Sequence, residues 1–275
     1  MQKTNAINEV VLFFSLTLGL SYCVFWGPLA LFQIPTISFV SDITGPVWAI
    51  ILLMMGGFSP SVVAILLTWQ REGPSGVKRF VQRAFHFKIG GRWYLVMIAL
   101  AGLATAGQLL INRLLENTFD PSLFLVQAGS IIPLLVIGPL SEEFGWRGYA
   151  LDRLQTRWSP TSSSIIIGIL WGFWHGPLFA MVGTSQHELK IPFIGFVCGV
   201  TALSVLFTWL HNNTSGSIWT AIFFHWIYTY MAQVIASGVT RSPLYNWLEY
   251  LPYIVVAVLI TAIWKPQPMM HVQPT

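Results

Sequence analysis

Long apolar runs, separated by short polar segments, dominate the 275-residue chain. Most runs are about 20 residues long, the length of an α-helix that crosses a bilayer. The pattern predicts an all-α membrane bundle of about eight transmembrane helices, arranged as one transmembrane domain over residues 1–275. The expected helices cover residues 10–32, 46–69, 93–114, 130–155, 162–182, 192–210, 217–236 and 248–264. The second run contains Gly56, Gly57 and Pro60, so a kink is expected there.

The composition agrees with a membrane protein and excludes an ordinary soluble domain. Hydrophobic residues make up 55% of the chain and charged residues only 9%, whereas soluble domains carry roughly 25% charged residues. The net charge is +4, and the basic residues cluster at predicted membrane edges, so no nucleic-acid partner is expected. The two cysteines, Cys23 and Cys198, lie in apolar runs and are expected to be small buried thiols without a disulfide.

The most basic segment, residues 70–92, follows the second apolar run. Phe80, Ala84 and Phe87 recur there at helical spacing, which is typical of an amphipathic helix on an anionic leaflet. A positive-inside loop is the alternative, and both readings place the segment in the cytosol. Because the predicted inner segments hold most of the Lys and Arg, both termini of this multi-pass protein are expected in the cytosol, with the chain in the plasma or cytoplasmic membrane.

Two adjacent carboxylates and an arginine end one of the apolar runs. A charge near the centre of a bilayer costs about 2.5–3.5 kcal/mol, so such groups are usually functional or paired inside a bundle. Glu143 and Arg147 are four residues apart, share a helix face and can pair. Glu142 points about 100° away from them, so it is not expected to join this pair and can take part in catalysis. We interpret this stretch as the acidic half of a buried catalytic site.

Two histidines, His175 and His225, fall inside other predicted spans. A polar cavity shared with Glu142 would provide hydrogen-bond partners for all three buried side chains. Trp171 precedes His175 by one helical turn and is expected either to wall this site or to serve as a core or lipid-facing aromatic. The remaining histidines are expected to be ordinary solvated or interfacial side chains; they are His86, His187, His211 and His271.

Glycines recur every four residues along two predicted helices. They are Gly168, Gly172 and Gly176 on one helix and Gly195 and Gly199 on the next. Such small-residue faces let helix backbones approach closely in membranes. Close packing of these helices would bring His175 near its neighbours.

The chemistry that fits these residues is hydrolysis without a covalent nucleophile. A carboxylate in a low-dielectric cavity can act as a general base toward water, and imidazoles can orient the water or stabilise an oxyanion. A zinc site of two histidines and one glutamate, with an open position, is the chemical alternative. The zinc-protease helix and the serine-nucleophile turn are not matched by this sequence.

Three ordered motifs carry a family resemblance. They are Glu-Glu-x-x-x-Arg at Glu142, Glu143 and Arg147, aromatic-x-x-x-His at Trp171 and His175, and a His followed four residues later by a polar residue at His225 and Thr229. Together they resemble the CAAX protease and bacteriocin-processing family, whose best-known members are the type II CAAX prenyl endopeptidases. The motifs lie within residues 130–236, where the catalytic core is expected.

The resemblance implies a role for each catalytic residue. Glu142 would activate the attacking water, and His175 would help bind it. His225 and Thr229 would stabilise the oxyanion. Position 229 is Thr where the family usually has Asn, and a Thr hydroxyl on a helix can instead bond its own i−4 carbonyl. The replacement of Asn by Thr at position 229 is therefore expected to affect catalytic efficiency, but not the fold.

The resemblance assigns supporting roles to Glu143, Arg147 and Trp171, and it implies a metal-free mechanism that requires no cofactor, with zinc as the alternative. The expected partners are the lipid bilayer and a membrane-associated protein or peptide, cleaved near its C-terminus and prenylated in some family members. The cavity is expected to open toward the cytosol, near Arg147 and residues 212–216. The alternatives are a non-catalytic immunity or scaffold protein of the same fold, a metal-dependent protease, and a proton-coupled carrier.

Overall fold

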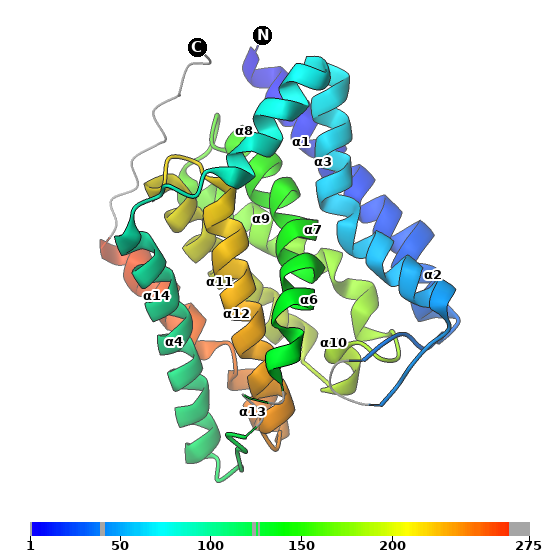
Figure 1. Cartoon of the computed structure of the whole chain (residues 1–275), viewed down its shortest axis with the longest axis vertical. Helices are drawn as coiled ribbons and strands as arrows, with labels where there is room; N and C mark the ends of the chain where they lie inside the picture. Colours follow the sequence, from blue (N-terminus) through cyan, green and yellow to red (C-terminus); the bar gives the residue numbers. More distant parts are fainter. Residues whose placement is uncertain (1, 39–41, 123–124, 126, 264–275) are drawn as a thin grey trace.

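The computed structural model describes residues 2–38, 42–122, 125 and 127–263, and helices form most of that part of the chain (Figure 1). Short 3-10 or π segments, labelled η, interrupt the α-helices. The first third contains α1 (Gln2–Gly19), η1 (Leu20–Phe25), α2 (Trp26–Leu31), α3 (Val47–Gln82), η2 (Arg83–Phe85) and α4 (Gly91–Leu114). The middle contains η3 (Gln127–Ser130), α6 (Ile131–Leu135), η4 (Val136–Leu140), α7 (Ser141–Glu143), η5 (Phe144–Leu151) and α8 (Asp152–Leu154). The last part contains α9 (Pro160–Trp174), η6 (Gly176–Phe179), α10 (Ser185–Glu188), α11 (Phe193–Asn213), α12 (Ile218–Gly238), α13 (Pro243–Leu248) and α14 (Leu251–Ile263).

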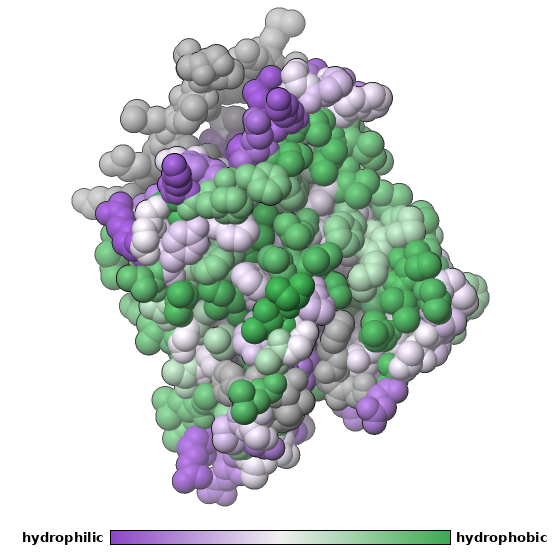
Figure 2. All heavy atoms as spheres, in the orientation of Figure 1, coloured by the Kyte–Doolittle hydropathy of each residue, from purple (hydrophilic) through white to green (hydrophobic). Residues whose placement is uncertain are grey.

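The predicted all-α membrane bundle is confirmed. Within the described residues, five helical stretches are long and apolar enough to cross a membrane: Ala6–Leu31, Val47–Phe85, Gly91–Leu114, Phe193–Asn213 and Pro243–Ile263. Hydrophobic residues occupy the broad middle of the visible surface, and hydrophilic residues gather toward its two ends (Figure 2). An apolar belt between polar ends is the arrangement that a bilayer requires.

The helices that carry the predicted chemistry are not among those five stretches. Residues 131–154 are divided into several short helical pieces, and α9 has only 15 residues. The continuous helix predicted for 130–155 is therefore wrong in detail. The last predicted span, 248–264, ends in a residue outside the described ones. The motif helix is therefore short and irregular, whereas α12, which carries His225 and Thr229, is a continuous helix of 21 residues.

The break in the motif helix occurs at Ile137 and Gly138, whose backbones are non-helical. Gly138 has φ +106° and ψ −83°, a conformation that only glycine adopts readily. Pro139 follows, and the residue before a proline avoids the α conformation. Ser141 closes the turn, because its Oγ accepts from the Gly138 N–H at 2.9 Å and donates to the Gly138 carbonyl at 3.1 Å. The helix restarts one turn before the two glutamates.

The backbone of the long helix α3 leaves the helical conformation at a place that the sequence pattern did not predict. The backbone is helical through Gly56 and Pro60, and it leaves the helical conformation only at Gly73, with φ +66°, before Pro74. Gly56 is needed for close packing, since a Cβ there would lie 2.2 Å from Nε1 of Trp26. The bend at Gly73 turns the basic segment across the end of the bundle, above α8 in Figure 1.

The basic segment packs its apolar side on the protein. Phe80 and Ala84 are buried, and the Phe80 ring lies 5.8 Å from that of Phe144 in the motif helix. The predicted amphipathic helix exists, but this face contacts η5 instead of lipid.

Two further expectations, for His211 and for the two cysteines, were wrong. His211 is buried and bonded to Asp152, and both cysteines are exposed free thiols on the apolar surface.

The glycine faces pack as predicted. A Cβ at Gly168 would lie 2.5 Å from Cα of Thr201, and one at Gly172 would lie 3.1 Å from Cα of Val197, both on α11. Gly199 is covered by the Tyr250 ring in the same way. The close α9–α11 contact fixes the end of α9, where His175 lies.

Candidate active site

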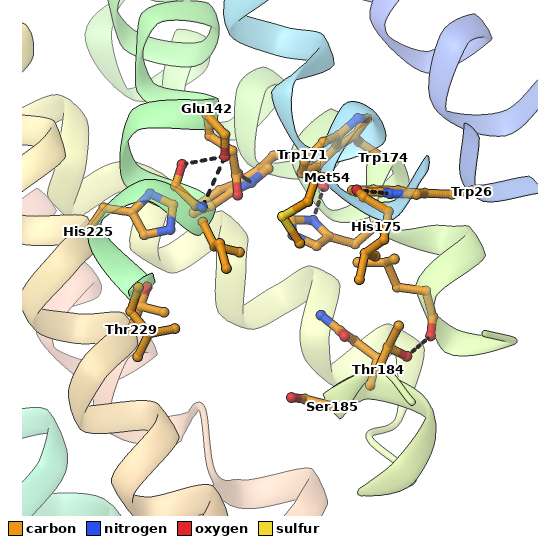
Figure 3. A pocket seen from close by; sticks show the side chains of 18 of the residues that line it. Trp26, Met54, Glu142, Trp171, Trp174, His175, Thr184, Ser185, His225 and Thr229 are labelled. Carbon is orange, nitrogen blue, oxygen red and sulfur yellow. Dashed lines mark hydrogen bonds between the residues drawn. The ribbon is translucent and has the colours of Figure 1, made fainter. Parts of the chain in front are cut away.

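A cavity of about 240 Å³ lies where the break in the motif helix meets α3, α9 and α12. Glu142, His175, His225 and Thr229 all line it, as does Trp171 (Figure 3). The four predicted catalytic residues come from three separate segments of the chain. The structure brings them to one cavity, and the other two predicted residues, Glu143 in α7 and Arg147 in η5, are fully buried behind it.

One oxygen of Glu142 is fixed by two indole groups. Glu142 Oε2 accepts from Nε1 of Trp171 at 2.5 Å and from Nε1 of Trp146 at 3.2 Å. Both tryptophans are buried. Two donors on one oxygen restrict the rotamer of the carboxylate and leave Oε1 toward the cavity. Glu142 is therefore held in a fixed orientation without losing both of its acceptor atoms.

Glu143 joins an arginine to a histidine. Its carboxylate accepts from Nη1 of Arg147 at 3.1 Å on each oxygen, and from Nδ1 of His225 at 2.6 Å. The Arg147 guanidinium is fully buried and also lies over the rings of Phe207, at 4.0 Å, and Trp171, at 4.6 Å. A buried cation needs such compensation, here one carboxylate and two aromatic faces. The pair sets the orientation of His225.

His225 presents its second nitrogen to the cavity. Because Nδ1–H donates to Glu143, Nε2 is the free ring atom. A methyl group at Gly138 would lie 3.3 Å from this Nε2 and 3.8 Å from Oε1 of Glu142. The unoccupied side of Gly138 is therefore a place that both groups reach. Tyr228 stacks on the His225 ring, with centroids 5.4 Å apart, and limits its rotation.

His175 lies on the other side of Trp171 from His225, with ring centroids 6.0 and 5.7 Å from the indole. Its Nδ1 lies 2.8 Å from the Trp171 carbonyl oxygen. A carbonyl only accepts, so Nδ1 carries the proton and Nε2 is an acceptor. In this tautomer His175 can accept a hydrogen bond from a water or from a substrate N–H.

The Thr229 hydroxyl has no hydrogen-bond partner among the described residues, although its oxygen is buried. It does not use the i−4 carbonyl of its own helix, which was the competing arrangement expected from the sequence. Buried hydroxyls without partners are rare in folded proteins. Thr229 therefore has a donor available on the cavity wall, one helical turn from His225.

The side chains of Glu142, His175 and His225 are not arranged around one point, as the ligands of a zinc ion would be. Across the described ranges, no group of three or more His, Cys, Asp and Glu side chains is close enough to hold a metal ion. Trp171 stands between the two histidines, and the indoles occupy one oxygen of Glu142. The residues present do not fit the zinc alternative, and the mechanism below uses none.

The lining of the cavity does not include the region where the sequence predicted its opening. Thr184, Ser185 and Gln186, in the loop and short helix α10, line the cavity far from residues 212–216, and Figure 3 shows Thr184 and Ser185 at the opposite side from Glu142. Residues 212–216 lie at the other end of the bundle, next to the basic segment, through Arg83 and Gly216. The expected opening beside Arg147 is therefore wrong.

Trp146 and Gly138 were missed by the sequence reasoning. Trp146 is four residues after Glu142, the same spacing that revealed the Glu143–Arg147 pair, so this signal was present. Gly138 precedes a proline, which also signals a break. Phe207 and Tyr228 had no such signal, because their contacts with Arg147 and His225 join different helices.

Fold and cavity together define a polytopic membrane protein with a buried cavity lined by a carboxylate and two histidines. Comparison with known families gives the more specific class: residues 124–231 match the sequence model of the Rce1-like family, described as type II CAAX prenyl endopeptidase Rce1-like. The chain is also 28% identical over 214 residues to CAAX prenyl protease 2 of Methanococcus maripaludis, an alignment that covers 73% of this chain and 77% of the relative. The family resemblance predicted from the three motifs is confirmed, and it supports a membrane peptidase of the CAAX endopeptidase type.

Replacing Gly138 with alanine should strongly reduce any peptidase activity. The methyl group would enter the space between His225 Nε2 and Glu142 Oε1, and the positive φ costs about 1–3 kcal/mol for other residues. We expect peptide cleavage to fall at least about tenfold. Gly102→Ala is the matched control, because nothing lies within 4 Å of a Cβ there. Equal cleavage rates for the two variants would contradict this assignment.

Proposed function

We propose that this chain is an intramembrane endopeptidase in which Glu142 activates water to hydrolyse a peptide bond. The observation that carries the proposal is the convergence of Glu142 Oε1 and His225 Nε2 beside Gly138, while Glu142 Oε2 is fixed by two indoles. The family likeness supports the peptidase class, and the geometry supports the choice of base.

The reaction follows from the atoms that are free. Glu142 Oε1 takes one proton from a water, and His175 Nε2 helps to position this water by accepting a hydrogen bond from its other O–H, which stays intact. The resulting hydroxide attacks the peptide carbonyl carbon. The oxyanion receives hydrogen bonds from Thr229 Oγ1 and from an N–H at Nε2 of His225, whose ring is held in place by the contact of Nδ1 with the Glu143 carboxylate. When the C–N bond breaks, Glu142 returns its proton to the leaving amine.

The substrate is a membrane-associated protein or peptide, because the cavity lies within a bundle enclosed by apolar helices. The relative's name adds a prenylated C-terminal segment as the first candidate. In this proposal the basic end of the bundle, with the N-terminus, lies in the cytosol, as the distribution of Lys and Arg favours.

The test is cleavage by purified protein in lipid vesicles, followed by mass spectrometry. Peptides ending in a prenylated and in an unmodified C-terminal segment would be supplied, with Glu142→Gln as the inactive form. The proposal expects fragments only with the original protein, in equal amount with and without EDTA. Fragments that disappear with EDTA would instead require a metal, and fragments equal in both proteins would remove Glu142 from the mechanism.

Thr229→Val should slow cleavage by about 10²–10³-fold, the usual effect of losing one oxyanion donor. Valine keeps the shape and removes only the hydroxyl. Thr105→Val is the matched control, since Thr105 also has a buried hydroxyl without a partner but lies on α4, outside the cavity. Thr229→Ser should keep most of the rate. A Thr229→Val enzyme as fast as Thr105→Val would exclude the hydroxyl from the reaction.

A further inference from the structure

A second cavity, of about 180 Å³, adjoins the active-site cavity. It is bounded mainly by α4, α12 and α14, and we call it the side chamber. The two cavities share part of their walls, including Tyr228, Thr229 and Gln233 of α12. Thr229, the proposed oxyanion donor, thus belongs to both walls, and the side chamber lies next to the catalytic groups.

Several buried oxygens that line the side chamber lack a hydrogen-bond partner. Oε1 of Gln108, Oε1 of Glu249 and the Tyr253 hydroxyl have none among the described residues. These three side chains are at most 6% exposed, and all of them line the side chamber. The Thr229 hydroxyl adds a fourth such oxygen at the shared wall. Buried oxygens without partners are rare, so the side chamber is expected to hold a molecule that donates hydrogen bonds.

These oxygens belong to helices that are apolar enough to cross a membrane. Gln108 lies in the stretch Gly91–Leu114, and Glu249 and Tyr253 lie in the stretch Pro243–Ile263. Polar and ionisable side chains in such helices usually face a partner inside the bundle or a water-filled cavity. One ordered water needs roughly 10–15 Å³ of space and about two to four polar partners. The side chamber has room for several waters and oxygens to bind them.

The charges of the side chamber disfavour an anion as its occupant. Nη2 of Arg241 donates to Oε2 of Glu249 at 2.6 Å, so this guanidinium is already paired with a carboxylate. The unpartnered Oε1 of the same Glu249 would repel a second carboxylate, such as the C-terminus of a peptide. Water both donates and accepts hydrogen bonds, so it can bind to the carboxylate, the amide oxygen and the hydroxyls alike.

The side chamber also adjoins a pocket at the protein surface. Ala236 and Arg241 line both the side chamber and this surface pocket, which lies beside α13. The exposed residues Lys190 and Trp247 border the surface pocket. The Arg241–Glu249 ion pair lies at the junction, and Nε of Arg241 also donates to the side chain of Asn246 at 2.8 Å. Water from the surface pocket would therefore pass this pair to enter the side chamber.

One face of α12 follows the whole route. Thr229 lines the active-site cavity and the side chamber, Ala232 lines the side chamber, and Ala236 lines the side chamber and the surface pocket. Intervals of three and four residues place these side chains on one side of the helix. The three cavities are thus arranged in series along α12.

We propose that the side chamber is a water inlet, which binds ordered water and supplies the molecule that Glu142 activates. Each cleaved peptide bond consumes one water, and a peptide bound against Glu142 would displace water from the active-site cavity. The side chamber delivers water past Thr229 while the peptide occupies that cavity. The inference rests on the proposed function for the use of the water, whereas the hydration of the side chamber follows from its own lining.

Cysteine labelling tests the hydration of the route without requiring activity. In a background with Cys23→Ser and Cys198→Ser, single cysteines would be introduced by Ala232→Cys in the side chamber and Ala236→Cys at its junction with the surface pocket. Ala221→Cys is the matched control, because Ala221 is fully buried on the same helix and lines none of the three cavities. Purified protein in detergent micelles would be treated with methanethiosulfonate ethylammonium, a small water-soluble cation, and the modified fraction followed by mass spectrometry.

We expect the cysteines at positions 232 and 236 to react at least about tenfold faster than the one at position 221, because thiols react as thiolates in a polar environment. Equal rates at positions 232 and 221 would show that the side chamber is dry and would overturn the proposal.

The same reagent then blocks the inlet in the folded protein. Modification of Ala236→Cys should lower kcat for peptide cleavage at least about tenfold with little change in KM, because the substrate cavity is untouched. Dithiothreitol, which removes the reagent, should restore kcat. Lys78→Cys is the control, because Lys78 is exposed in the basic segment and its modification should leave both constants unchanged.

The outcomes separate the inlet from the proposed function. Full modification at position 236 with an unchanged kcat, in a protein whose cleavage still requires Glu142, overturns the inlet and leaves the proposed function standing. Rapid labelling at positions 232 and 236 in a protein that cleaves no peptide supports the hydrated side chamber and counts against the proposed function alone.

Discussion

Glu142→Gln should abolish detectable peptide cleavage while leaving the protein folded. The amide keeps an oxygen that can accept from Trp171 and Trp146, so the side chain stays in place. It cannot take a proton from water, and a positioned general base contributes about 10²–10⁴-fold to a rate. We expect kcat to fall by about that factor with little change in KM, because the substrate contacts of the cavity remain. Initial rates over a range of peptide concentrations would measure both constants.

The control for this change is Glu116→Gln. It makes the same chemical substitution on an exposed residue after α4, at a distance from the cavity. Its kcat and KM should equal those of the original protein. If Glu142→Gln lost activity only because its melting temperature fell, the carboxylate would be a structural group. If the substitution raised KM without changing kcat, the carboxylate would be a binding group. Either result would show that the proposed base is wrong.

Arg147→Met should be among the most destabilising single substitutions in the chain. It removes the guanidinium from a fully buried pair and leaves Glu143 with His225 as its remaining partner. Breaking a buried ion pair by removing one member costs about 3–5 kcal/mol, because an uncompensated charge stays inside. The contacts of the cation with Phe207 and Trp171 are lost as well. Unfolding by titration with SDS in mixed micelles would measure the change in free energy.

The double variant Arg147→Met with Glu143→Gln separates charge from packing. Removing both charges should recover much of the lost stability, since replacement of a whole buried pair is often nearly neutral. Arg79→Met is the control, because Arg79 pairs with Glu72 at 3.0 Å on the surface, where such pairs contribute about 0–1 kcal/mol. Equal free energies of unfolding for Arg147→Met and Arg79→Met would show that Glu143 does not depend on its arginine.

The spacing of residues within a single helix was a reliable guide to contacts in the structure. The four-residue interval from Glu143 to Arg147 predicted a pair that the structure contains. The same interval from Glu142 to Trp146 would have predicted another. Such pairs depend only on the geometry of one helix. The glycine faces of α9 and α11 are of the same kind, because small residues at regular spacing leave one side of a helix free for close packing.

The positions of breaks within helices were harder to predict from the sequence than the helices themselves. Both Gly56–Gly57–Pro60 and Gly73–Pro74 could bend α3, and the chain bends at Gly73. Glycine permits an unusual backbone conformation, but packing decides whether it is adopted. At Gly56 the indole of Trp26 lies against a regular helix, whereas Gly73 lies in the basic segment, beyond the apolar part of α3.

By itself, the sequence determined the helical membrane bundle, the family resemblance and the set of candidate residues that the structure places around one cavity. These follow from apolar run length, composition and short-range spacing, which act within one segment at a time. Only the tertiary structure decided that Thr229 has no hydrogen-bond partner among the described residues, and that Gly138 leaves a space between Glu142 and His225. Each of these depends on contacts between residues far apart in the chain, and the periodicity of a single helix carries no information about which neighbour will cover it.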